Sequence, residues 1–131
     1  MKTILLVSFL FGSILMIKEQ SLLKTETMTY EKALAISKQN NKPIMLKLTA
    51  NNCKFCLKME NEVLSDIGVK SLLDENFITV SFNVDKEALP LNLEKSITPT
   101  FVFVDKNEKI TSKLPGSWSK KDFIELLNNR I

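Results

Sequence analysis

Hydrophobic residues along the chain fall into two patterns, short continuous runs and longer stretches in which apolar positions recur at helical spacing. Continuous runs rich in β-branched and aromatic residues predict strands, whereas spacings of three and four residues predict helices with one buried face. The predicted strands cover residues 44–48, 77–84, 100–104 and 109–114. The predicted helices cover residues 30–39, 53–64 and 69–75, and a last one follows Ser119.

Capping and turn residues separate these elements. Thr29 is a suitable N-cap for the first helix, and Pro43 disfavours helical backbone at Lys42, which ends it. The expected buried face of this helix contains Tyr30, Ala33, Leu34 and Ser37. Residues 66–68 (Asp-Ile-Gly) are expected to break the second helix, and residues 106–108 to form a hairpin turn.

The last helix is predicted to begin at a serine cap and to bury one face. Ser119 is the expected N-cap, with Asp122 in the first turn, and Gly116 precedes it as a residue without a Cβ. The expected apolar face contains Phe123, Ile124, Leu127 and Ile131. The order helix, strand, helix, helix, strand, hairpin and helix indicates an α/β sandwich with a mixed sheet.

The N-terminal segment has a different character. Lys2 precedes an apolar stretch that runs to Ile17, and polar residues 18–20 close it. The pattern predicts a signal peptide over residues 1–17, although no A-x-A cleavage site is present and the segment could also remain as a membrane anchor or fold as a buried helix. Residues 18–28 predict a linker or a weak first strand. Export would place the chain in an oxidising compartment, expected to be the bacterial periplasm.

Length and charge narrow the class of protein. The chain has 131 residues, of which 44% are hydrophobic, and this fits one globular domain over residues 29–131. The formal net charge is only +3 and the lysines are scattered along the chain. This distribution is typical of a solvated surface and does not indicate binding of nucleic acid.

The two cysteines provide the candidate chemistry. Cys53 and Cys56 form a C-x-x-C pair between the first predicted strand and the second predicted helix. Backbone N–H groups and the dipole at a helix start favour negative charge, so the thiolate of Cys53 would be stabilised there. A thiolate is the nucleophile of disulfide exchange, and a second thiol one turn away can resolve the mixed disulfide.

Two other interpretations of the cysteine pair are less favoured. A zinc site usually has four ligands, and the chain has no histidine and no third cysteine, so no metal is expected. A purely structural disulfide would close a very short loop, and a cross-link over so few residues adds little to the stability of the fold. The pair therefore indicates redox chemistry without a bound cofactor.

Three blocks of sequence resemble the thioredoxin fold, in particular exported thioredoxin-like proteins. The blocks are residues 42–56 with the Lys-Pro and C-x-x-C, residues 83–85 (Asn-Val-Asp), and residues 98–100 (Thr-Pro-Thr) followed by the hairpin and Gly116. The resemblance covers residues 30–130 and implies a three-layer sandwich, with helices on both faces of a mixed central sheet.

The resemblance also implies roles for four residues. Cys53 would be the nucleophile and Cys56 the resolving cysteine, in exchange with the thiols and disulfides of protein substrates. The Thr98–Pro99 peptide bond would be cis and would lie against the cysteines, where its backbone binds an extended substrate. A separate redox partner would regenerate the pair. Membrane contact is expected only if the N-terminal segment stays uncleaved.

The sequence departs from the family's pattern around the cysteines. Asn52 replaces the familiar tryptophan, and Lys54-Phe55 lies between the cysteines instead of Gly-Pro or Pro-His. Without histidine, stabilisation of the thiolate is left to the helix end and to lysines. Lys54 is either a solvated charge or a modest modulator of the thiolate. Phe55 is expected at the surface beside the site, where it could contact a substrate.

Lys47 marks a further departure. The family commonly has a buried acid six residues before the first cysteine, and its lysine partner corresponds here to Ser81. One interpretation is that Lys47 extends along the sheet and reaches water with its amine. The other is that the charged amine stays near the sulfurs, stabilises the thiolate and makes the pair more oxidising.

The function indicated by the sequence is protein thiol–disulfide oxidoreduction. The direction of electron flow remains open, since about 30 mV of reduction potential corresponds to only about 1.4 kcal/mol. One alternative is a binding module that presents Thr98 and Pro99 to a partner without turnover. A thiol peroxidase of the same fold is less favoured, because such enzymes usually lack a C-x-x-C.

Overall fold

The computed structural model describes residues 27–131. The predicted targeting segment, residues 1–17, and most of the predicted linker, residues 18–28, lie outside this range. No helix among residues 27–131 has the length and hydrophobicity needed to cross a membrane. The elements are α1 (Tyr30–Asn40), β1 (Ile44–Thr49), α2 (Lys54–Met59), the π-helical turn η1 (Glu60–Leu64), α3 (Ile67–Asn76), β2 (Ile78–Asn83), the 3₁₀ turn η2 (Pro90–Asn92), β3 (Thr100–Val104), β4 (Ile110–Pro115) and α4 (Lys120–Asn128).

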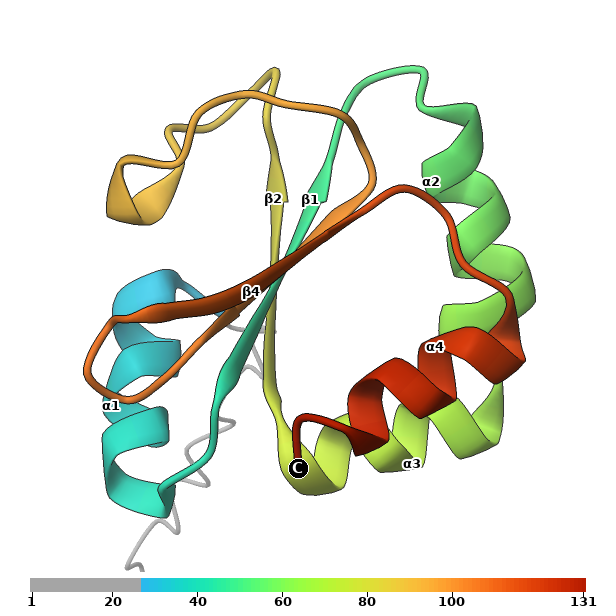
Figure 1. The fold of residues 1–131 in the computed structure, drawn as a ribbon. Helices are drawn as coiled ribbons and strands as arrows, with labels where there is room; N and C mark the ends of the chain where they lie inside the picture. Colours follow the sequence, from blue (N-terminus) through green and yellow to red (C-terminus); the bar gives the residue numbers. More distant parts are fainter. Residues whose placement is uncertain (1–26) are drawn as a thin grey trace, which may run out of the picture.

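A four-stranded mixed sheet with the order β2-β1-β3-β4 forms the centre of the molecule. β1 runs parallel to β2 and antiparallel to β3, which pairs antiparallel with β4. α1 covers one face of the sheet, and α2, α3 and α4 cover the other (Figure 1). The three-layer sandwich expected from the sequence is therefore confirmed.

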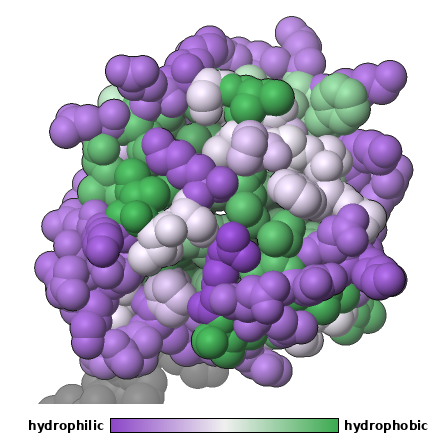
Figure 2. All heavy atoms as spheres, viewed as in Figure 1, coloured by the Kyte–Doolittle hydropathy of each residue, from purple (hydrophilic) through white to green (hydrophobic). Residues whose placement is uncertain are grey.

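Alternation along the central strands divides the core into two clusters. Met45 of β1 and Phe101 and Phe103 of β3 pack with α2, α3 and α4, whereas Leu46 and Val102 pack on the side of α1. Every residue of β3 is buried, as expected for a central strand covered on both faces. Figure 2 shows hydrophilic side chains over most of the face that carries β4, with apolar patches between them.

The ends of α1 follow the predicted capping pattern. The Thr29 hydroxyl accepts a hydrogen bond from the Lys32 N–H, and Asn41 ends the helix with a left-handed backbone (φ 54°). On the predicted face, Tyr30, Ala33 and Ser37 are buried, and Leu34 is partly buried against the same cluster. The Ser37 hydroxyl is satisfied because it donates to the Lys42 carbonyl at 2.5 Å.

Two helix predictions need correction. α3 begins at Ile67 rather than Val69, because the Asp66 carboxylate caps it by accepting the Val69 N–H at 3.1 Å. α4 ends at Asn128, so Ile131 lies beyond the helix and is 64% exposed instead of completing its apolar face. Of the rest of that face, Phe123 and Leu127 are fully buried and Ile124 is partly buried against the same cluster.

β3 has the predicted bounds, and each of the other three strands differs from its prediction by one residue at one or both ends. β2 starts at Ile78 rather than Phe77, because the Phe77 N–H still bonds to the Leu73 carbonyl of α3. Phe77 is nevertheless buried, and its ring lies 5.6 Å from that of Phe103 in an edge-on arrangement. Phe77, the first residue of the predicted strand, therefore belongs to the end of α3, and the strand begins one residue later.

Candidate active site

The two cysteines form a disulfide at the start of α2. Cys53 is the N-cap of this helix and Cys56 lies in its first turn, with 5.2 Å between their Cα atoms. The Cys56 N–H points at the Cys53 sulfur, with a nitrogen–sulfur distance of 3.1 Å. Both residues are partly exposed. The helix start predicted near Cys53 is confirmed, and the N–H of Cys56 in its first turn is directed at the first sulfur.

A tight turn between β1 and α2 sets the position of Cys53. β1 ends at Thr49, and Asn52 adopts a left-handed backbone with φ 51°. Asparagine tolerates this conformation better than most residues with a Cβ, because its short polar side chain forms local hydrogen bonds. The asparagine in place of the familiar tryptophan is therefore compatible with the geometry of the turn.

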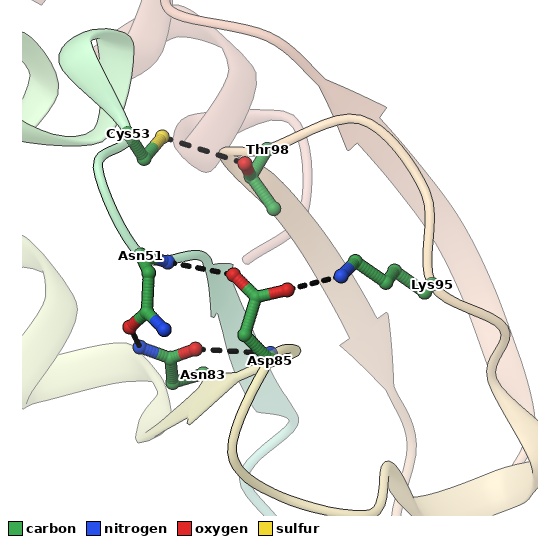
Figure 3. Close-up of polar contacts among 6 residues, drawn as sticks. All are labelled: Asn51, Cys53, Asn83, Asp85, Lys95 and Thr98. Carbon is green, nitrogen blue, oxygen red and sulfur yellow. Dashed lines mark hydrogen bonds and ion pairs between the residues drawn. The ribbon is translucent and has the colours of Figure 1, made fainter.

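Thr98 and Pro99 lie directly against this turn. The Thr98–Pro99 peptide bond is cis, and the Thr98 hydroxyl lies 3.4 Å from the Cys53 sulfur as a hydrogen-bond donor (Figure 3). Pro99 is buried, and its carbonyl accepts the Gly116 N–H at 2.8 Å. Gly116 has φ 91°, a conformation that favours glycine. The loops before β3 and after β4 thus hold Thr98 beside the disulfide.

A polar network lies beneath the same turn and was not indicated as a functional feature by the sequence. The Asp85 carboxylate accepts the Asn51 N–H at 2.8 Å with one oxygen and is paired with the Lys95 ammonium through the other (Figure 3). Asn83 donates to the side-chain oxygen of Asn51 at 3.1 Å and accepts the Asp85 N–H at 3.0 Å. The hydrogen bond from Lys95, and next that from the Asn51 N–H, hold the pKa of Asp85 below its usual value.

The structure places the Lys47 amine against a carboxylate. Lys47 Nζ lies 2.8 Å from Glu60 Oε2, and the Lys47 side chain is 19% exposed. Ser81 is its neighbour on β2, as the sequence register predicted, so β2 supplies no charged partner at this position. Glu60 follows Cys56 by one helical turn. The Lys47 charge near the cysteine helix is therefore matched by a negative charge that sequence spacing alone did not indicate.

Exposed side chains surround the disulfide. Lys54 is exposed, and Phe55 is 57% exposed, which confirms its predicted place at the surface. Ile97, immediately before Thr98, is 63% exposed. A hollow of about 460 Å³ is lined in part by Leu48, Ile97 and Thr100, and neither cysteine lines it. No group of three potential metal ligands occurs within residues 27–131.

Comparison with known proteins identifies the family. The family model described as a thioredoxin-like domain matches residues 30–131, so the chain belongs to the thioredoxin-like family. Among solved structures, a thioredoxin from Thermus thermophilus superimposes with a TM-score of 0.65 and 31% sequence identity, covering 77% of this chain and 82% of that one. The fold and the family expected from the sequence are confirmed.

Further proteins are similar to the chain at lower identity. A disulphide isomerase from Xylella fastidiosa Temecula1 has a TM-score of 0.63 at 22% identity and covers 76% of this chain and 86% of its own. Among curated proteins, the anterior gradient protein 2-B of Xenopus laevis is 30% identical over 95 residues, or 72% of this chain. The match spans 57% of that relative's length.

Proposed function

We propose that the protein is a thiol–disulfide oxidoreductase that exchanges disulfides with protein substrates. The observation that carries the proposal is the Cys53–Cys56 disulfide at a helix start, with Thr98 of the cis Thr98–Pro99 pair 3.4 Å from the Cys53 sulfur. The membership in the thioredoxin-like family supports the same conclusion.

In the reducing direction, the Cys53 thiolate attacks one sulfur of a substrate disulfide and releases the other substrate sulfur as a thiolate, which takes up a proton. Cys56, after losing its proton, attacks the Cys53 sulfur and releases the second substrate thiol. Two electrons pass to the substrate, and the Cys53–Cys56 disulfide is left behind. Oxidation of a substrate dithiol is the reverse sequence, and in either direction a redox partner regenerates the pair.

The surroundings of the disulfide suit a polypeptide substrate. The backbone of Thr98 and Pro99 would pair with an extended substrate segment, while the exposed side chains of Phe55, between the cysteines, and Ile97, next to Thr98, offer apolar contacts. Lys54 at the start of α2 would favour the thiolate modestly, because a nearby positive charge stabilises a negative one.

Reduction of insulin disulfides in the presence of dithiothreitol tests the proposal. The wild-type protein is expected to accelerate the reaction well above the rate with dithiothreitol alone, and Cys53→Ser is expected to abolish that acceleration, since Cys53 is the attacking sulfur. Cys56→Ser should accumulate the mixed disulfide on Cys53. Equal rates for wild type and Cys53→Ser would instead favour a binding module without turnover.

Export to the bacterial periplasm is part of the proposal and rests on the sequence pattern of residues 1–17. A reporter enzyme that needs disulfides for activity, fused after Thr25, is expected to be active with this segment present and inactive when residues 2–17 are deleted. Activity of the deleted fusion would contradict export.

A further inference from the structure

The groups that react and the groups that bind substrate lie on two separate loops. Cys53 ends the loop that follows β1, and Thr98 and Pro99 end the loop that precedes β3. β1 and β3 are antiparallel neighbours, and Leu48 pairs with Thr100, so both loops leave the sheet at the same end. A polypeptide held by Thr98 reaches the Cys53 sulfur only if the two loops keep a fixed relation to each other.

Asp85 connects the two loops with a single carboxylate. Its Oδ2 accepts the Asn51 N–H at 2.8 Å, two residues before Cys53, and its Oδ1 is paired with the Lys95 ammonium, three residues before Thr98. Figure 3 shows the carboxylate between these two partners, below Cys53 and Thr98 in the view. We call the contacts of Asp85 with Asn51 and Lys95 the Asp85 bridge.

The end of β2 holds the Asp85 bridge in place. The Val84 N–H bonds to the Thr49 carbonyl at 2.8 Å, which continues the pairing of β1 with β2. Asn83 accepts the Asp85 N–H, and its own N–H donates to the Glu87 carboxylate at 2.8 Å. The carboxylate is therefore presented from a segment that is fixed to the sheet, which is the arrangement needed for precise positioning.

We propose that Asp85 is a positioning residue that sets the Thr98–Pro99 loop relative to Cys53 for polypeptide substrates. This inference rests on the proposed function. A polypeptide must contact the Thr98 loop and the Cys53 sulfur together, whereas a small disulfide needs only the sulfur. Loss of the Asp85 bridge therefore slows exchange with polypeptides and leaves exchange with small disulfides nearly unchanged.

The two arms of the bridge differ in strength. The hydrogen bond from the Asn51 N–H to a carboxylate is charge-assisted, and the Asp85 side chain is only 24% exposed. The Lys95 side chain is 64% exposed, so its ion pair is screened by water and contributes less. Asp85→Ala removes both arms, Asp85→Asn keeps an acceptor for Asn51, and Lys95→Met removes the weaker arm alone.

The test compares two substrates for each variant. The rate of insulin reduction reports on a polypeptide, and the reaction of the reduced protein with a small aromatic disulfide reports on the sulfur alone. Asp85→Ala is expected to lower kcat/KM for insulin about tenfold, and Lys95→Met about twofold, with the small-disulfide rate of each variant equal to that of the wild type. If the arms act through one carboxylate, Asp85→Asn and Lys95→Met combine non-additively.

Matched controls exist elsewhere in the chain. Asp105 is also a carboxylate that accepts backbone N–H groups, from Asn107 at 2.8 Å and Lys109 at 2.9 Å, but it lies in the turn at the opposite end of β3. Lys120 forms an exposed ion pair with Asp66 at 3.1 Å. Asp105→Ala and Lys120→Met are expected to keep the wild-type ratio of the two rates, even if they lower the melting temperature.

Each outcome decides between the alternatives. If Asp85→Ala does not fold, as judged by thermal unfolding, Asp85→Asn and Lys95→Met carry the test. A folded variant that slows both substrates equally, or neither, overturns the positioning role while leaving the proposed function intact. A wild-type protein that fails to accelerate insulin reduction overturns the proposed function, and the positioning role with it.

Discussion

Lys47 and Glu60 bring a matched pair of charges to the helix that carries Cys56. Their 2.8 Å ion pair leaves the lysine side chain mostly shielded and the glutamate side chain 54% exposed. Glu60 lies one helical turn after Cys56, and the positive and negative charges of the pair act on a nearby thiolate in opposite directions. The reactivity of the pair therefore depends on both residues, and removing one exposes the influence of the other.

Single substitutions of these two residues are expected to shift the thiolate in opposite directions. Lys47→Met leaves the Glu60 carboxylate unpaired near the cysteines, which disfavours a second negative charge. The pH midpoint of Cys53 alkylation in the reduced protein should rise by about half a unit, and Glu60→Gln should lower it by a similar amount. Midpoints that stay unchanged in both variants would mean that the ion pair is purely structural.

Residue identity alone explains some features of the site and not others. Cys53 and Cys56 could be located from the sequence, because a C-x-x-C before a helical pattern has few other uses in a chain without histidine. Glu60 could not be recognised as the partner of Lys47, because the contact joins a strand to a helix and depends on their packing. The Asp85 bridge could not be predicted for the same reason, because Asp85 and Asn51 are 34 residues apart in the sequence.

At the scale of elements, the hydrophobic pattern identifies types better than boundaries. All four strands and the main helices occur where the pattern predicted them. The errors fall where a side chain outside the periodic run decides the end, as Asp66 does by capping α3 two residues early. Ile131 follows Leu127 at helical spacing, but α4 ends at Asn128. The spacing of apolar residues does not indicate where a helix ends.

The helix that follows Cys53 changes its hydrogen-bond pattern partway along. α2 is regular only from Lys54 to Met59, and η1 continues it with π-helical hydrogen bonds from Glu60 to Leu64. The apolar spacing predicted a single uniform helix here, because a π-turn changes the hydrogen bonds and shifts the face by only a fraction of a turn. Met59, Val63 and Leu64 remain buried through this change.

At the scale of the whole molecule, a polar contact joins α1 to the turn between β3 and β4. The Tyr30 hydroxyl donates to the Glu108 carboxylate at 3.1 Å, across 78 residues of sequence. Tyr30 is 8% exposed, and it is the only tyrosine in the chain. Burial, and next the hydrogen bond to Glu108, raise the pKa of Tyr30 from 10.0 to about 12.

This raised pKa links the stability of the fold to alkaline pH. Between pH 10.0 and about 12, the unfolded chain has lost the tyrosine proton and the folded protein still holds it. The stabilisation is therefore fully present below pH 10.0 and is lost as the pH rises through the folded pKa. Tyr30→Phe cannot titrate, so its free energy of unfolding should fall less steeply over that interval than that of the wild type.

Urea unfolding of both proteins across this pH interval measures the difference, because the contribution of the lysines is common to both and cancels. Glu108→Gln is the matched variant, since it keeps an acceptor for the hydroxyl but removes the charge that opposes ionisation. Its slope should lie between those of the wild type and Tyr30→Phe. Parallel pH dependences for all three proteins would show that Tyr30 ionises as readily in the folded protein as in the unfolded chain, which would contradict the raised pKa.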